Sequence, residues 1–148
     1  MLRSVLLPLL LAFCLVFSQA SGAPAETVWS GLVIATNVAQ PTPIPSELHR
    51  MEGTLKHLFG YNQFQVIGQA REQLKSGDED WRANSKYFSL RVDSKAAKTP
   101  AAYLLKLQLF QEQKMLLETE ARLSKSSPLV SKGPQVGAGQ LLLVLVLQ

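Results

Sequence analysis

Three consecutive acidic residues, Asp78, Glu79 and Asp80, form the first group in this sequence with an evident chemical use. Clustered carboxylates suit a hard cation such as calcium, which takes several oxygen ligands. A calcium loop also needs further spaced ligands and a closing glutamate, and Trp81 interrupts the run at once. The pattern therefore predicts a solvated acidic turn rather than a metal site.

A second pair of carboxylates, Glu118 and Glu120, lies two residues apart on one expected strand. Strand geometry separates them by about 7 Å, close to the spacing that glycosidases use. No neighbouring residue would desolvate either carboxylate, and Arg122 continues the same face. This arrangement is typical of an exposed charge ladder, not of a catalytic pair.

The other residues that could take part in catalysis or binding lack the accompanying residues that such a site requires. His49 and His57 are the only histidines, and their spacing of eight is not the spacing of four found on a zinc-binding helix, so both are expected at the surface. The glycine-rich segment 133–139 leads into a strand and lacks the Gly-Lys-Ser/Thr ending of a phosphate loop. The sequence therefore predicts no catalytic, cofactor-binding or metal-ligating residue, and a protein that is not an enzyme.

The first 25 residues predict an export signal. Arg3 supplies a positive start, an apolar run extends from Leu6 to Phe17, and small residues at 18–20 and 23–25 fit a cleavage site. The apolar run is too short for a membrane anchor, so we expect no stable transmembrane span in the mature chain. The predicted organisation is a signal peptide over 1–25 and a single domain over 26–148, exported to the periplasm or out of the cell.

Composition narrows the class of protein further. The only cysteine, Cys14, lies in the signal, so the mature domain has neither a disulfide nor a thiol. A secreted domain without disulfides or an N-x-S/T sequon is typical of bacteria. Without Arg3, 14 basic and 11 acidic side chains remain, a net charge of +3. Their scattered distribution does not indicate nucleic-acid binding.

The hydrophobic periodicity begins with a strand over 27–36, a proline-rich connector over 40–45, and a helix from Pro45 or Ser46 to a stop at Gly60. We interpret Gly53, in mid-helix, as a point of close packing against the sheet. The predicted buried stripe of the helix consists of Leu48, Met51, Leu55, Leu58 and Phe59.

After this helix, apolar residues recur at every second position. This period predicts strands near 64–68, 88–92, 103–109 and 115–123, in which Met115, Leu117, Thr119, Ala121 and Leu123 share a buried face. A loop is expected over 124–139 and an apolar strand over 141–147. The order β-α-β-β-β-β-β predicts an α+β two-layer domain, with one helix packed on a mainly antiparallel sheet of about six strands.

This order of elements resembles the cystatin-like fold, in which an antiparallel sheet cradles a helix. The segment from Phe64 to Gly68 is similar to the inhibitor motif Q-x-V-x-G, but Phe64 replaces the leading glutamine. The Pro-Trp pair of the second inhibitory hairpin is also missing. The resemblance therefore implies an architecture and not protease inhibition.

A second resemblance covers most of the mature chain. Segments 55–64 and 127–134 are similar to segments of uncharacterised exported bacterial proteins. Those proteins have no activity to carry over, so this resemblance implies a bacterial exported domain and nothing about its chemistry.

Two functional hypotheses follow. The favoured one is a non-catalytic exported or envelope module that binds a protein partner or a second copy of itself. The alternative is a periplasmic ligand-binding or hydrolytic domain with a site near the 124–139 loop. One helix covers less than half of one face of a six-stranded sheet, yet the first and last strands are apolar on both faces. We therefore expect a partner-binding surface at Leu142, Val144 and Val146.

Overall fold

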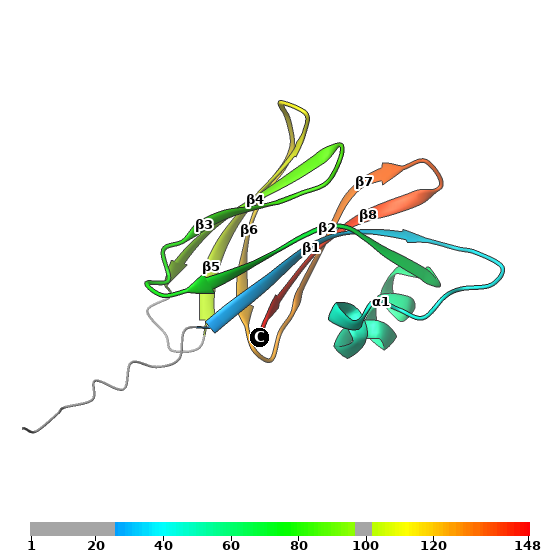
Figure 1. Ribbon diagram of the computed structural model, residues 1–148, viewed down its shortest axis with the longest axis horizontal. Coiled ribbons are helices and arrows are strands. Elements are labelled where there is room, and N and C mark those ends of the chain that lie inside the picture. The colour runs from blue at the N-terminus through cyan, green and yellow to red at the C-terminus, as the bar shows by residue number, and fades with distance from the viewer. Residues whose placement is uncertain (1–25, 97–101) are drawn as a thin grey trace, which may run out of the picture.

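The computed structural model describes residues 26–96 and 102–148, which form eight strands and one short helical segment (Figure 1). The signal expected over 1–25 lies outside the described residues. The strands are β1 (Glu26–Thr36), β2 (Gln63–Leu74), β3 (Asp80–Asn84), β4 (Phe88–Ala96), β5 (Ala102–Gln111), β6 (Lys114–Ser124), β7 (Leu129–Val136) and β8 (Gly139–Leu147). The helical segment joins a 3-10 turn, η1 (Ser46–Met51), to an α-helix, α1 (Glu52–Phe59).

The strands form two four-stranded antiparallel sheets. The order is β2-β1-β8-β7 in one sheet and β3-β4-β5-β6 in the other. We call these the covered sheet and the open sheet, because the helical segment lies over the first and leaves the second exposed. The expected α+β two-layer fold with a single sheet of about six strands is therefore wrong. The described chain is mostly β, and its helical segment has only 14 residues.

Two of the eight strands are absent from the sequence prediction, each for a local reason. β3 begins inside the acidic run and is only five residues long, so its alternation of buried Trp81 and Ala83 is too brief to stand out. β7 contains Gly133 and Pro134, which made its segment look like a loop. The register of β7 against β8 shifts between Lys132 and Gln135, and an interrupted ladder tolerates proline there.

The main core lies between the two sheets, and alternating residues of both sheets fill it. This arrangement confirms the period-two faces predicted for β4 and β5. The register of β5 against β6 shifts between Leu109 and Phe110, so the expected alternation fails at Met115, which is 47% exposed. The fully or nearly fully buried members are Val28, Leu32, Leu74, Trp81, Ala83, Phe88, Leu90, Val92, Leu105, Leu107, Leu109, Leu123, Leu141, Leu143, Leu145 and Leu147.

A second, smaller core lies on the other face of the covered sheet, beneath the helical segment. β1 and β8 are the two central strands of this sheet, so one face of each meets the open sheet and the other meets the helical segment. This position explains why both strands are apolar on both faces. The buried members of this second core are Trp29, Val33, Ala35, Leu48, Met51, Leu55, Phe64, Leu142, Val144 and Val146.

The helical segment departs from a regular helix in a way that changes its buried stripe. It begins after Pro45 and ends at Gly60, whose left-handed φ of 67° confirms the predicted stop. Its first six residues are 3-10, with three residues per turn, which shifts the stripe around the axis. Leu58 is consequently 66% exposed and does not belong to the core. Gly53 is also exposed, and a Cβ at this position would meet no atom within 4 Å, so the interpretation as a packing glycine is wrong.

Candidate functional site: a charged groove on the open sheet

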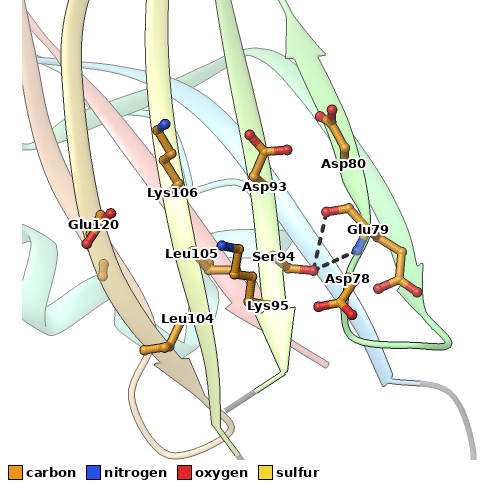
Figure 2. A pocket seen from close by; sticks show the side chains of 11 residues that line it. Asp78, Glu79, Asp80, Asp93, Ser94, Lys95, Leu104, Leu105, Lys106 and Glu120 are labelled. Atoms are coloured by element: carbon orange, nitrogen blue, oxygen red, sulfur yellow. Dashed lines mark hydrogen bonds between the residues drawn. The ribbon is translucent and has the colours of Figure 1, made fainter.

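A groove of about 870 Å³ crosses the outer face of the open sheet near the start of β3 and the end of β4 (Figure 2). All four strands of this sheet contribute to it, together with the turn that precedes β3. The residues lining it are Asp78, Glu79, Asp80, Asp93, Ser94, Lys95, Leu104, Leu105, Lys106, Glu120 and Ala121. We refer to these residues as the acidic groove.

The strand register brings the charged side chains of the groove into one row. Asp80 pairs with Asp93, Asp93 pairs with Lys106, and Lys106 pairs with Glu120. Paired residues of an antiparallel ladder point to the same face, so four strands present four charges side by side. The row spans roughly 14 Å, from three strand spacings of about 4.8 Å.

The groove concentrates negative charge on a basic chain. It holds five acidic residues, Asp78, Glu79, Asp80, Asp93 and Glu120, against the two basic residues Lys95 and Lys106. Nearly half of the 11 acidic side chains of the chain are therefore in one place, along with three of the 15 basic ones when Arg91, which pairs with Asp80 and Asp93, is counted. The lining carries a formal charge of −3, or −2 together with Arg91, on a chain whose net charge is +4.

Arg91 lies between two of these carboxylates and organises them. Its Nη2 is 2.7 Å from Oδ2 of Asp80 and 3.7 Å from Oδ1 of Asp93. The hydrogen bond from Arg91 lowers the pKa of Asp80 below its ordinary value, although desolvation opposes the shift. The same hydrogen bond raises the pKa of Arg91. Asp80 is therefore ionised at neutral pH and fixed in position against its neighbouring strand.

Glu79 stabilises the turn that precedes β3 at the start of the groove. Its Oε1 accepts hydrogen bonds from the backbone nitrogens of Lys75 and Ser76, at 2.7 and 2.8 Å. Desolvation opposes ionisation of Glu79, but these backbone bonds outweigh it and lower its pKa. The hydroxyl of Ser94 accepts a hydrogen bond from the Glu79 nitrogen (Figure 2). It also donates one to the carbonyl of Gly77. The acidic run is thus a turn, as predicted, and Asp80 already belongs to β3.

Glu118 and Glu120, the pair with glycosidase-like spacing, lie in different surroundings. Glu118 lies outside the groove, where its Oε2 accepts a 2.8 Å hydrogen bond from Nε2 of Gln108. That bond lowers the pKa of Glu118, whereas a general acid requires a raised pKa. Glu120 lies in the groove, and Arg122 is exposed beyond it. The exposed positions of all three residues agree with the predicted charge ladder.

The other sequence candidates lie away from the groove. His49 and His57 are both exposed on the helical segment, as predicted. The segment 124–139, suggested as a ligand site, contains β7 and the turn into β8, and none of its residues lines the groove. Within the described residues, no three His, Cys, Asp or Glu side chains gather in a way that would hold a metal ion.

The three residues expected to bind a partner are inside the protein. Leu142 and Val144 are fully buried and Val146 is 4% exposed, all in the core beneath the helical segment. The premise behind their selection, an uncovered apolar face, does not hold, because Leu48, Met51 and Leu55 of the same chain cover that face.

The sequence alone does not predict the groove, because the groove depends on the pairing of β3 with β4. Its residues come from four separate segments, and only the register aligns them. One feature of the sequence does point to the groove. Polar residues alternate with apolar ones in β4, β5 and β6, which predicts that each of these strands exposes a polar, partly charged face.

Comparison with known proteins adds no assignment, because no protein-family model, curated protein or solved structure matches this chain. The similarity to exported bacterial proteins therefore stays a prediction. No helix in the described part of the chain has the length and hydropathy needed to cross a membrane.

Proposed function

We propose that this protein is a non-catalytic exported module that binds a basic segment of a protein partner in the acidic groove. The observation that carries the proposal is the concentration of charge: the groove, with Arg91 included, has a formal charge of −2 on a chain of +4. Complementary charge steers association and selects the partner, so a lysine- or arginine-rich segment is the chemistry that fits.

The packing of the two sheets supports a surface site over an internal one. The side chains between the sheets are almost all completely buried and belong to one continuous cluster. The groove instead lies on the exposed side of the open sheet, where Leu104 is 45% exposed at its border. A partner segment would cross the strands there, with its cations beside the carboxylates of the groove and its apolar stems on Leu104.

The groove has few properties of a catalytic centre. The carboxylates with a shifted pKa, Asp80 and Glu79, are both shifted downward, toward permanent ionisation. General acid–base catalysis at neutral pH needs a group whose pKa is moved toward 7. Binding, rather than reaction, is the use that these fixed charges support.

A lysine peptide of about ten residues provides a defined test. We expect it to bind the exported protein with a strong dependence on salt, and an equivalent glutamate peptide not to bind. The double variant Asp93→Lys/Glu120→Lys should weaken peptide binding by about tenfold or more. The matched control Glu47→Lys/Glu72→Lys changes the net charge equally but lies outside the groove, and should bind as the wild type does. Equal affinities for both variants would refute the groove as the binding site.

Export itself is part of the proposal and has a separate test. The signal expected over 1–25 should be removed during secretion from a bacterial host. Mass measurement of the exported protein should then give a new N-terminus between Ser21 and Glu26. A secreted product that still begins at Met1 would contradict this part of the proposal.

A further inference from the structure

The end of the open sheet opposite the groove carries a basic surface, in contrast to the acidic groove. The β3–β4 turn and the β5–β6 hairpin both project at this end (Figure 1), and the backbone nitrogen of Glu112 in the hairpin bonds to the carbonyl of Tyr87 in the turn. We call this surface the basic tip. It comprises Arg82, Lys86, Tyr87, Phe110, Glu112, Lys114 and Met115.

Apolar and cationic groups are interleaved on the basic tip. Tyr87 is 58% exposed and Met115 is 47% exposed, and Met115 pairs with Phe110 across the hairpin. The guanidinium of Arg82 lies 5.9 Å from the centre of the Phe110 ring, and Nζ of Lys86 lies 5.2 Å from that of Tyr87. With Lys114 and the single acid Glu112, the tip has a formal charge of +2.

We propose that the basic tip of one molecule docks into the acidic groove of a second copy, so that the protein associates head to tail. This inference rests on the proposed function and names the partner: the basic segment that the groove binds is the tip of the same chain. Each half of the contact is present on every molecule, with a charge of +2 on the tip and of −2 on the groove with Arg91 included. Exposed apolar side chains accompany both halves, Tyr87 and Met115 on the tip and Leu104 in the groove.

The geometry of one sheet makes this contact intermolecular. The tip row at Asn84 and Ser89 is four residues along β3 and β4 from the groove row at Asp80 and Asp93. This separation is roughly 13 Å along strands of the same rigid sheet. Arg82 is only two residues from Asp80 and acts on its own groove, but Lys86, Tyr87 and Lys114 at the end of the tip cannot reach it. A contact between two different surfaces of identical molecules is heterologous, and it extends into a chain of copies or closes as a ring.

A hairpin tip in a groove buries less area than a standard protein interface. We therefore expect weak association, with a Kd between roughly 10 μM and 1 mM, that weakens further as salt rises. Sedimentation of the exported protein over a wide range of concentration should show mass increasing beyond the dimer. A monomer throughout that range would overturn the inference, while lysine-peptide binding to the groove would still uphold the proposed function.

Charge reversal gives a sharper test because each half of the contact can be changed alone. The tip variant Lys86→Glu/Lys114→Glu and the groove variant Asp93→Lys/Glu120→Lys should each lower self-association by about tenfold or more. The control Arg50→Glu/Arg71→Glu has the same net charge as the tip variant and should associate like the wild type. Circular dichroism of each variant establishes that it is folded.

Mixing the two variants distinguishes this geometry from any other. The intact tip of the groove variant fits the intact groove of the tip variant, and the reversed tip of the tip variant fits the reversed groove of the groove variant. The mixture should therefore associate with the two variants in alternation, although neither variant associates alone. A chain that carries all four substitutions should again associate with itself, because both halves are reversed. Absence of association in the mixture would overturn the inference. Binding of the tip to anionic vesicles, with unchanged self-association of the tip variant, would assign the tip to a lipid surface instead.

Discussion

The indole nitrogen of Trp81 donates a 2.9 Å hydrogen bond to the hydroxyl of Ser30 in the core between the two sheets. Trp81 belongs to β3 of the open sheet, and Ser30 belongs to β1 of the covered sheet. Ser30 is completely buried and Trp81 is 7% exposed, so neither group has water as an alternative partner. The bond therefore fixes the position of one sheet against the other at a polar contact within a mainly apolar interior.

Replacement of Ser30 by alanine should destabilise the protein by about 1–3 kcal/mol, because it leaves the buried N–H of Trp81 without an acceptor. Urea unfolding of the variant measures this loss. The double variant Ser30→Ala/Trp81→Phe removes both partners and should show a smaller penalty than the sum of the two single substitutions. Strict additivity would mean that the two side chains do not interact.

Gly31 is required beneath the ring of Trp29. A Cβ at this position would overlap the indole, which is itself fixed by a 2.8 Å hydrogen bond from Nε1 to Oε1 of Gln69. We expect Gly31→Ala to cost about 1–3 kcal/mol in the free energy of unfolding, through overpacking. The control Gly53→Ala lies on exposed helix with open space around it and should stabilise by about 0.5–1 kcal/mol. Thermal unfolding of both variants checks the opposite signs.

Leu55 and Leu58 are both leucines of α1 but differ completely in burial, at 0% and 66% exposure. Leu55→Asp would place an unpaired charge in the second core and should cost several kcal/mol, enough to unfold a domain of ordinary stability. Leu58→Asp should change the free energy of unfolding by about 0.5 kcal/mol or less. Comparable losses in the two variants would show that the helical segment does not cover the sheet in this orientation.

Stability should fall at alkaline pH through Tyr103. Desolvation, and then a hydrogen bond with Glu26, raise the pKa of Tyr103 from 10.0 to about 12 in the folded protein. The unfolded chain therefore releases this proton at lower pH than the folded chain, so the contribution is fully present below pH 10 and is lost as the pH rises to about 12. The urea midpoint of the wild type should decrease across that interval, and Tyr103→Phe should decrease less. Identical pH profiles would contradict the assignment.

The sequence by itself determined most of the local structure. Strands β1, β4, β5, β6 and β8 were evident because an apolar residue at every second position, or at every position, already encodes a buried strand face. The helix stop at Gly60 followed from a conformation that glycine adopts readily. The exposure of Glu118, Glu120 and Arg122 followed from the same alternation.

Only the tertiary structure decided how those strands combine. Sequence periodicity specifies which residues of a strand are buried but not which strand or layer buries them, and the chain crosses between sheets after β2 and after β6. The consequences differ for two sets of residues. Leu142, Val144 and Val146 looked like a free surface until the helical segment of the same chain proved to cover them. Asp80, Asp93, Lys106 and Glu120 looked unrelated until the register of four strands placed them in one groove, because neighbours across a sheet are set by pairing and not by distance along the chain.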